Sequence, residues 1–461
     1  MKLERIETPG IAHYAYLLAD GGEAVLVDPS RDPQPYLDAA RRMGVRIRFV
    51  LETHRQEDFV MGSAEIARRC EAKIVSGRHE IFAHSDIRLD PGECLTLGAL
   101  RIEARPTPGH TPESHCYVVY QGPGEAAWAV FSGDTLFYGE TGRTDLPDAD
   151  RTAEFAGQLY DAVQAELAPL PDACLLLPAH GPGSVCGSGM AEQPLATIGE
   201  ERRRNPVFTQ SRAKYVASKG SEIPPRPPFF RLMEEVNLAG GLAPRRLPRE
   251  LPLLPPATLR QALEGQPAGA LVIDTREPEA YAGGHAPGSL SIWTGGLPVF
   301  AGWVAGADTP VHLITESEGD IELAAGHLER IGLDGLRGAL AGGFARWRSS
   351  GHPIATAGTI TPRALAPRTG ELQIVDVRED GEFASGHIEG AVNVYVGTLA
   401  TEGVPDHLDP NAPTVVTCGV GHRAGLGLSL LQRAGFQQLH NLLGGMSAWE
   451  ALQLPLVRPR D

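Results

Sequence analysis

The sequence predicts a multi-domain α/β protein, and three observations lead to this prediction. The chain has 461 residues, which at about 150 residues per domain suggests about three domains. Runs rich in β-formers alternate with helical runs and turn signals through residues 1–200. Roughly the last two hundred residues contain two copies of one unit, related by a constant offset of 102 positions.

Residues 1–200 form the first predicted domain. Helices are predicted over 33–44 and 58–70. The strands are predicted over 14–20, 23–29, 47–54, 72–77, 116–120, 127–134 and 173–180. Side chains of the types that bind metals come directly after strands, where open sheets and sandwiches place their sites: Asp28, His54, Asp134 and His180.

Residues 201–249 are predicted to be a connector, because proline and arginine accumulate there. The segment begins near "EERRRNPVF", in which Arg202, Arg203 and Arg204 are consecutive. These arginines would either meet an anionic carrier such as coenzyme A or form the solvated face of a helix.

The internal repeat divides the remaining chain into two predicted domains, 250–356 and 357–461. "LVIDTREPEAYAGGHAPGSL" and "QIVDVREDGEFASGHIEGAVN" share the same spaced residues. The pairs at an offset of 102 are Asp274 and Asp376, His285 and His387, Gly288 and Gly390, Trp347 and Trp449, and Pro353 and Pro455. Each copy alternates strands and helices, so a mainly parallel sheet is expected in each.

A cysteine follows a predicted strand in the second copy. "PTVVT" ends in "CGVGHRAG", and a predicted helix follows. Cys418 therefore lies at a strand-to-helix turn, where backbone N–H groups and the helix N-terminus favour an anion and Arg423 adds positive charge. The turn suits a thiolate or a persulfide on Cys418.

"CGVGHR", the D-V-R-E strand end and the closing "GGMSAW" together resemble a rhodanese (sulfurtransferase) domain. The resemblance implies that Cys418 carries the transferred sulfur, that Arg423 helps to hold sulfite or thiosulfate, and that a loop cradles the sulfur: Gly419, Val420, Gly421 and His422. In the first copy the offset places Glu316 at the cysteine position and Ile321 at the arginine position. We therefore expect an inactive rhodanese-like domain over 250–356 and an active one over 357–461.

The stretch "ETHRQEDFVMG" resembles a two-metal turn of the form H-x-H-x-D-H with two ligands replaced. Gln56 and Phe59 stand where histidines would be expected after His54. With "PTPGHTPES", "FSGDTLF" and "LPAHGPGS", the stretch resembles the metallo-β-lactamase fold over residues 1–200. That resemblance implies an αββα sandwich with a metal between its sheets.

His54, His110 and Asp134 remain from this set of motifs. Two histidines and one carboxylate with open positions are typical of mononuclear non-haem Fe(II) oxygenases. The set resembles that of the persulfide dioxygenases in this superfamily, which implies one Fe(II) per chain and O2 as co-substrate.

Five neighbouring residues have more than one possible role. Asp58 would either hydrogen-bond to a metal-bound histidine or water, which we expect, or bind the metal itself, and His180 would either bind a second metal, orient a metal ligand or contact substrate. Arg143 would pair with a substrate carboxylate, with Asp145, or in a surface salt bridge. Cys186 is either a reactive thiol or a packed side chain.

The whole chain resembles the fusions of persulfide dioxygenase and sulfurtransferase. The implied function is oxidation of a low-molecular-weight thiol persulfide, of the glutathione or coenzyme A type, to sulfite and thiol. Sulfur transfer through Cys418 would then form thiosulfate, as in sulfide detoxification. Two alternatives are a zinc-dependent thioester hydrolase of the glyoxalase II type with an appended sulfurtransferase, and a metal-free sulfur carrier or sensor.

The composition limits the kinds of partner and the cellular location that we expect for the protein. The formal net charge of -16 disfavours nucleic acid, whose phosphates would be repelled. The N-terminal sequence has no apolar core of a signal peptide, and no stretch approaches the ~20 apolar residues of a membrane span. We expect a cytoplasmic protein with no membrane contact, and the family resemblance implies a homo-oligomer.

Overall fold

The computed structural model describes residues 1–122, 124–187, 189–244, 251–265 and 267–458. The end of the predicted connector (245–249), residue 250 and the last three residues of the chain lie outside the described residues. Two compact units result. The first unit contains 1–226, 230–244 and 330–332, and the second contains 227–229, 245–329 and 333–461.

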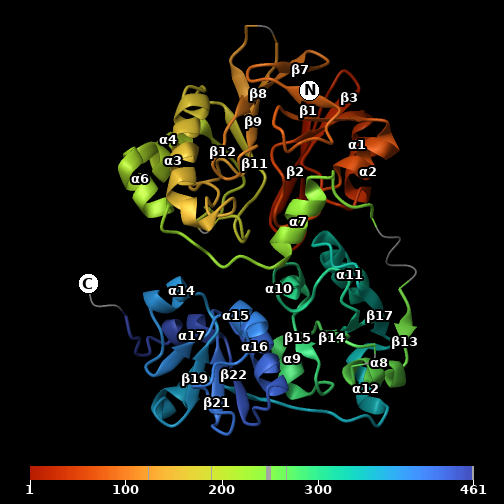
Figure 1. Ribbon diagram of the computed structural model, residues 1–461, viewed down its shortest axis with the longest axis vertical. Coiled ribbons are helices and arrows are strands. Elements are labelled where there is room, and N and C mark those ends of the chain that lie inside the picture. The colour runs from red at the N-terminus through yellow and green to blue at the C-terminus, as the bar shows by residue number, and fades with distance from the viewer. Residues whose placement is uncertain (123, 188, 245–250, 266, 459–461) are drawn as a thin grey trace. The chain divides into compact units, whose positions relative to one another are not determined.

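The first unit is built on two six-stranded sheets (Figure 1). One sheet has the order β1-β2-β3-β4-β5-β6, with bounds Lys2–Thr8, His13–Asp20, Glu23–Val27, Arg46–Glu52, Lys73–Gly77 and Ile87–Leu89. The other has the order β12-β11-β10-β9-β8-β7, with bounds Ala196–Thr197, Leu175–Pro178, Ala127–Gly133, His115–Tyr120, Leu100–Pro106 and Cys94–Leu97. Val25 and Leu51 of the first sheet share one buried cluster with Ile102 and Val119 of the second, so the sheets face each other.

Helices cover the outer faces of this sandwich. Tyr36 of α1 (Gln34–Met43) and Ile66 of α2 (Ser63–Cys70) pack with Leu26 of the first sheet. Leu159 of α3 (Thr152–Ala162) packs with Val130 of the second sheet. The expected αββα sandwich is confirmed.

The predicted helix over 58–70 begins later than expected, at Ser63. Gly62 precedes it and lies so close to the chain at Ser30 that an added Cβ would be 2.1 Å from the Ser30 carbonyl oxygen. Its N–H donates to the Pro29 carbonyl at 2.8 Å instead of continuing a helix. The turn from His54 to Gly62 therefore stays irregular.

In its described residues, the segment predicted as a connector contains four short helices, the first of which begins just before it. Their bounds are α4 Ile198–Arg204, α5 Pro206–Thr209, α6 Arg212–Lys219 and α7 Phe229–Asn237. Tyr215 of α6 joins the buried cluster under α3 and donates or accepts a 2.6 Å hydrogen bond with Thr141. Composition alone suggested a linker, but buried aromatic and polar contacts attach most of this segment to the first unit.

The second unit contains two five-stranded parallel sheets of the same strand order. The first copy has β13-β17-β16-β14-β15, with bounds Leu253–Leu254, Leu336–Leu340, Val311–Ile314, Leu271–Asp274 and Leu290–Ser291. The second copy has β18-β22-β21-β19-β20, with bounds Gly358–Ile360, Leu439–Leu442, Thr414–Thr417, Gln373–Asp376 and Ala391–Asn393. The predicted duplication of a parallel α/β domain is confirmed.

Helices pack around both sheets. In the first copy they are α8 Pro256–Leu263, α9 Pro278–Gly283, α10 Leu297–Val304, α11 Ile321–Arg330 and α12 Gly343–Ser349. In the second they are α13 Pro362–Leu365, α14 Asp380–Ser385, α15 Val396–Thr401, α16 His422–Arg433 and α17 Gly445–Ala451. Paired residues have equal roles: Trp347 and Trp449 each donate from the indole nitrogen to the carbonyl of Pro353 or Pro455 at 2.9 Å.

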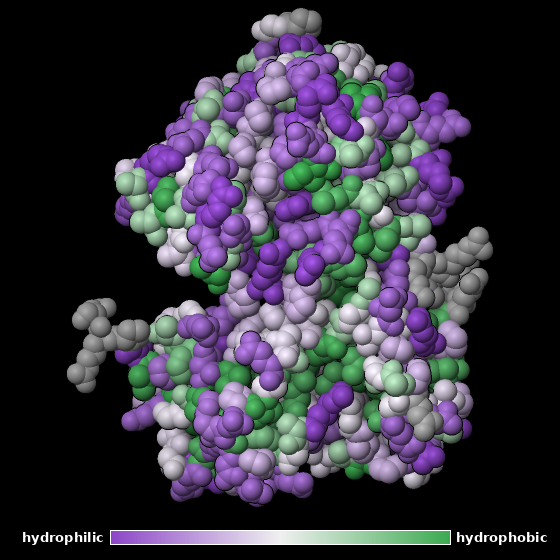
Figure 2. Space-filling model, viewed as in Figure 1, coloured by the Kyte–Doolittle hydropathy of each residue, from purple (hydrophilic) through white to green (hydrophobic). Residues whose placement is uncertain are grey.

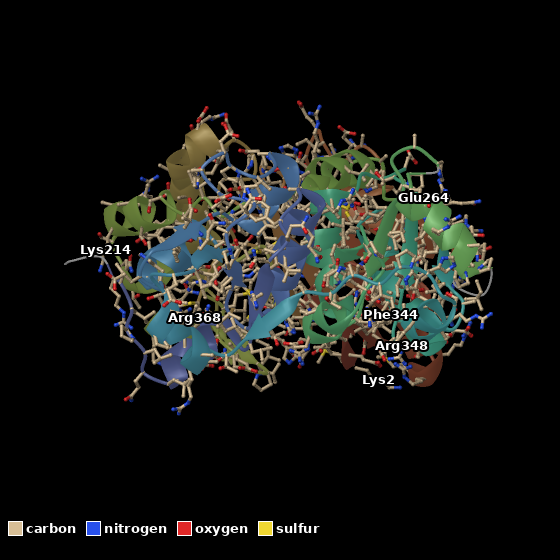
Figure 3. All side chains as sticks on the ribbon, turned by 90° about the horizontal axis from the view of Figure 1, so that it is seen from below. Lys2, Lys214, Glu264, Phe344, Arg348 and Arg368 are labelled. Atoms are coloured by element: carbon tan, nitrogen blue, oxygen red, sulfur yellow. The ribbon has the colours of Figure 1, made fainter. Side chains whose placement is uncertain are left out.

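The surface mixes hydrophilic and hydrophobic residues on the face drawn in Figure 2. Charged side chains such as Lys214 and Arg368 are exposed (Figure 3). Among the described residues, no helix combines the length and the apolar character needed to span a membrane.

Candidate metal centre and cysteine loop

The candidate ligands come from loops that follow strands of both sheets. His54 follows β4, Asp134 follows β10, and His180 follows β11. His110 lies in the loop between β8 and β9. Gly133 has a φ of 53°, and an added Cβ would lie 2.6 Å from Thr53 Oγ1, so the loops of the two sheets meet only because this residue is glycine.

Three buried ligand-type atoms converge at this point. Asp134 Oδ2 lies 3.8 Å from His54 Nε2 and 3.4 Å from His110 Nε2. One ligand atom from each of the three residues falls within 4.8 Å of the others. All three side chains are buried.

The hydrogen bonds on the far side of each imidazole fix its orientation. Thr53 Oγ1 donates to Asp28 Oδ2 at 2.7 Å, so it accepts a hydrogen bond from His54 Nδ1 at 2.9 Å. His110 Nδ1 donates to the Arg143 carbonyl at 2.8 Å. Both Nε2 atoms therefore present lone pairs toward Asp134.

Burial keeps these histidines neutral. It lowers the pKa of His54 to about 3 and also lowers the pKa of His110. Burial would raise the pKa of Asp134, but the neighbouring His180 and His54 hold it well below its ordinary value. Neither His110 Nε2 nor Asp134 Oδ2 has a hydrogen-bond partner among the described residues. Two neutral nitrogens and one carboxylate oxygen, buried without a donor between them, fit a bound cation.

A second group of ligand-type residues lies beside the first. Asp58, His180 and Cys186 also have ligand atoms within 4.8 Å of one another. His180 Nδ1 donates to Asp134 Oδ1 at 2.8 Å, and its Nε2 lies 3.1 Å from Asp58 Oδ2. Burial would lower the pKa of His180, but Asp134 and Asp58 raise it well above its ordinary value. His180 therefore bridges two carboxylates.

Phe59 and Cys186 also lie close to His180. Phe59 is fully buried, with its ring centroid 6.3 Å from that of His180 and 4.2 Å from that of His13. Burial raises the pKa of the Cys186 thiol well above its ordinary value, and the negative charge of Asp58 acts in the same direction. Cys186 is a buried neutral thiol beside Asp58 and His180.

Two ionisable residues near the site were not singled out from the sequence. Glu57 Oε2 lies 3.5 Å from His110 Nε2, and burial raises the pKa of Glu57 well above its ordinary value. Arg55 Nε lies 3.5 Å from Glu57 Oε1 and 3.6 Å from Glu113 Oε1. The sequence signal was available, since Glu57 lies between Gln56 and Asp58 in the same turn.

A third overlooked residue, Asn237, supports the turn from the predicted connector. Its Nδ2 donates to the carbonyls of Gln56 at 2.6 Å and Phe59 at 2.8 Å. The N–H of Met61 donates to its Oδ1 at 2.8 Å. No local sequence pattern could have paired α7 with this turn.

Of the arginines singled out from the first unit, Arg143, Arg202 and Arg204 make contacts within the protein, and Arg203 is exposed. Arg143 makes a bidentate, buried pair with Asp145 at 2.7 and 2.6 Å, so it is neither a surface bridge nor free to meet a substrate carboxylate. Arg202 donates to Asp172 and to the carbonyls of Ala168 and Leu170. Arg204 donates to Glu201 at 2.6 Å.

Cys418 occupies the expected strand-to-helix turn of the second copy. It follows β21, and its Sγ accepts hydrogen bonds from the N–H groups of Gly421 at 3.1 Å and Ala424 at 3.4 Å. Gly421 has a φ of 107° as the residue that caps α16. This curved loop aims backbone dipoles at the sulfur, which favours negative charge there.

Arg423 lies in this loop but is paired within the protein. Its two terminal nitrogens donate to the carboxylate of Glu382 at 2.6 and 2.7 Å. Burial would lower the pKa of Arg423, but Glu382 raises it above its ordinary value. Arg423 is therefore a cation that Glu382 holds in place and whose charge Glu382 partly compensates.

In the first copy, Thr315 stands at the position of the cysteine, because Ile314 pairs with Asp274 as Thr417 pairs with Asp376. The N–H of Phe344 donates to the Thr315 carbonyl, as that of Met446 donates to the Cys418 carbonyl. The expected match of Glu316 to Cys418 is therefore wrong by one residue.

Comparison with known proteins agrees with both halves of the architecture. Residues 8–180 match the metallo-beta-lactamase superfamily, and residues 255–350 and 363–452 each match the rhodanese-like domain. The mitochondrial persulfide dioxygenase of Homo sapiens is 28% identical over 248 residues, covering 52% of this chain and 89% of that protein.

Two further similarities extend this comparison. A probable metallo-hydrolase of Burkholderia pseudomallei is 33% identical over 246 residues, covering 44% of this chain and 80% of that protein. The crystal structure of a metallo-beta-lactamase from Staphylococcus aureus is 26% identical with a TM-score of 0.65, and covers 74% of this chain and 98% of that one.

Proposed function

Because the chain belongs to the metallo-β-lactamase superfamily and carries two rhodanese-like domains, we propose that it is a persulfide dioxygenase joined to a sulfurtransferase. A single Fe(II) held by His54, His110 and Asp134 would serve the oxidation of a low-molecular-weight thiol persulfide to sulfite and thiol. Cys418 would transfer sulfane sulfur to make thiosulfate. The similarity to a persulfide dioxygenase over about half of the chain supports the substrate class.

One observation carries the first half of this proposal. His54 Nε2, His110 Nε2 and Asp134 Oδ2 meet in a buried place, and the last two have no hydrogen-bond partner among the described residues. When bound there, Fe(II) would supply open coordination positions for O2 and the persulfide sulfur. Phe59 fills a position where a second metal would require a histidine, which favours one metal over two.

Hydrogen bonds within the protein would orient the metal ligands of this site. Thr53 and the Arg143 carbonyl hold the two imidazoles with Nε2 inward, and His180 orients Asp134 through its other oxygen. The buried rings of Phe59 and Phe137 exclude water from the side of His180.

The second half needs no metal. Cys418 Sγ would attack the outer sulfur of a thiol persulfide, whose S–S bond breaks and releases the thiol after it takes up a proton. The sulfur lone pair of sulfite would then attack the outer sulfur on Cys418. That S–S bond breaks, Cys418 leaves as the thiolate held by the N–H groups of Gly421 and Ala424, and thiosulfate is formed.

A second candidate function is a zinc-dependent hydrolase. Asp58, His180 and Cys186 form a second group that could hold a metal, and one relative is a probable metallo-hydrolase. This candidate requires two metals per chain and no consumption of O2.

Two matched variants test the proposal on the full chain supplied with glutathione persulfide or coenzyme A persulfide. His54→Ala should abolish O2 uptake while sulfur transfer from thiosulfate continues. Cys418→Ser should keep O2 uptake and sulfite release but form no thiosulfate. Persulfide-dependent O2 uptake that survives His54→Ala would contradict the iron site, and sulfur transfer that survives Cys418→Ser would contradict the carrier role.

A further inference from the structure

The first rhodanese-like copy has no cysteine at its loop, yet it contacts the loop of the second copy directly. His422 belongs to that loop and is the first residue of α16. The ring of Trp293, from the first copy, stacks on His422 with centroids 4.6 Å apart and planes at 19°. Glu277 Oε2, also from the first copy, lies 3.3 Å from His422 Nε2.

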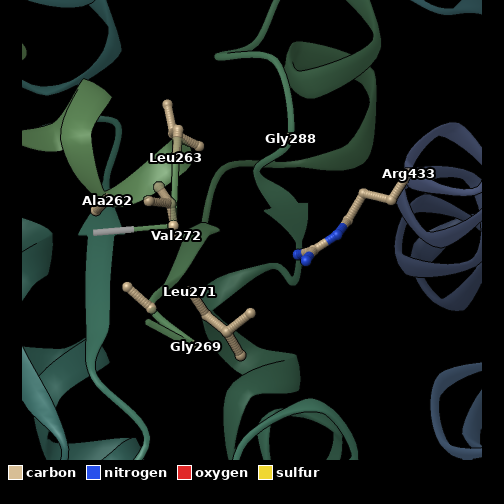
Figure 4. A pocket seen from close by; sticks show the side chains of 9 residues that line it. Ala262, Leu263, Gly269, Leu271, Val272, Gly288 and Arg433 are labelled. Atoms are coloured by element: carbon tan, nitrogen blue, oxygen red, sulfur yellow. The ribbon is translucent and has the colours of Figure 1, made fainter. Parts of the chain in front are cut away.

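The first copy also contacts α16 beyond its first residue. An added Cβ at Gly425 would lie 2.9 Å from Pro278 Cβ and 3.1 Å from Ser291 Oγ, so glycine permits this close approach. The N–H of Ser291 donates to Ser429 Oγ at 3.1 Å. At the far end, Arg433 lines a cavity of about 230 Å³ together with Leu271 and Val272 (Figure 4).

The side chains on the outside of this loop make few contacts with the second copy. Arg423 is committed to Glu382 of its own copy, and Val420 is half exposed. His422 is 40% exposed and is held on one face by Trp293 and at Nε2 by Glu277. These two contacts of His422 therefore come from the copy that has no cysteine at its loop.

We propose that the first rhodanese-like copy is a positioning element for the sulfur-carrying loop, and that Trp293 and Glu277 act through His422 to set the loop's affinity for anionic sulfur compounds. The pair restrains the residue that precedes Arg423, and with it the N–H groups around Cys418. The inference rests on the proposed role of Cys418 as sulfur carrier. It gives the first copy a function although Thr315 stands at the cysteine position.

The test uses the full chain and thiosulfate-to-cyanide sulfur transfer. Trp293→Ala and Glu277→Ala should each raise KM for thiosulfate about three- to tenfold, the size expected of a partly exposed ring or polar contact, with a smaller change in kcat. Trp293→Phe keeps a ring and should stay within about twofold of the wild type. Glu279→Gln, on the same helix α9 and exposed, is the matched control and should change nothing.

A double-variant comparison separates this mechanism from general destabilisation. In a His422→Ala background, Trp293→Ala and Glu277→Ala should have no further effect on KM, because both act through the same side chain. Effects that add in that background, or an unchanged KM in both single variants, would overturn the proposal.

A second readout does not depend on catalysis. The rate at which iodoacetamide alkylates the 1% exposed Cys418, followed by mass spectrometry of its peptide, should rise at least threefold in Trp293→Ala and Glu277→Ala. It should not rise in Trp293→Phe or Glu279→Gln. The Cys418→Ser variant tests only whether Cys418 carries sulfur. An unchanged alkylation rate in the two alanine variants would refute the positioning role, whatever the result for Cys418→Ser.

Discussion

Asn237→Ala should detach the turn that carries His54 from the helix that supports it. Asn237 is fully buried on α7 and makes three hydrogen bonds to backbone groups between Gln56 and Met61. Alanine removes two N–H donors and one acceptor at once. The turn would keep its sequence and its metal ligand but lose its anchor.

The magnitude follows from the groups that are left behind. Two carbonyls and one N–H lose their partners in a buried place, and each such loss costs about 1–3 kcal/mol. Partial entry of water would reduce the sum, so we expect the free energy of unfolding of the first unit to fall by about 3–5 kcal/mol. Metal affinity should fall at least about tenfold, the usual scale for groups that orient ligands.

The assay measures metal retention during dialysis against a graded chelator, together with thermal unfolding of the same protein. Glu235→Ala on the exposed face of the same helix is the control and should retain both properties. Equal metal retention and an equal unfolding temperature in Asn237→Ala and the wild type would refute the argument that α7 holds the turn.

The remaining predictions concern both centres. Phe59→His should raise the bound metal above one ion per chain by supplying the missing ligand beside Asp58 and His180, as measured by elemental analysis. An unchanged number of metal ions per chain would contradict the view that Phe59 prevents binding of a second ion. Glu382→Gln should lower KM for thiosulfate about two- to fivefold, because the charge of Arg423 is no longer compensated. Burial would raise the pKa of Glu382, but Arg423 lowers it. The pair therefore stabilises the protein above the ordinary carboxylate pKa, and this stabilisation is lost as pH falls. In Glu382→Gln, the free energy of unfolding should therefore depend less on pH in the acid range. Removing metal with a chelator should lower the unfolding temperature of the first unit only, and equal shifts in both units would argue against a metal in the sandwich.

The fold could be predicted wherever the signal was local or repeated. The offset of 102 residues identified two copies, and the structure gives them the same strand order. The hydrogen bonds of Trp347 and Trp449 to equivalent proline carbonyls are alike in the two copies because each joins residues only six positions apart. The helix start at Ser63 was misplaced because the carbonyl of Ser30, distant in sequence, determines the conformation at Gly62.

The parts of the site that escaped prediction depend on contacts between distant segments. Asn237 lies 176 positions from Met61, and it lies in a segment whose composition suggested only a linker. Arg423 was expected to face a substrate anion, but α14 brings Glu382 to it. The candidate residues themselves were recognisable, since the motifs around His54, His110, Asp134 and Cys418 are short and ordered.

Metal content is the most direct test of the central claim that the sandwich holds one iron at His54, His110 and Asp134. The measurement is elemental mass spectrometry on anaerobically purified full-length protein, with His54→Ala prepared in parallel. We predict about one iron per chain in the wild type and almost none in the variant. Two zinc ions per chain, or no metal in the wild type, would contradict the account.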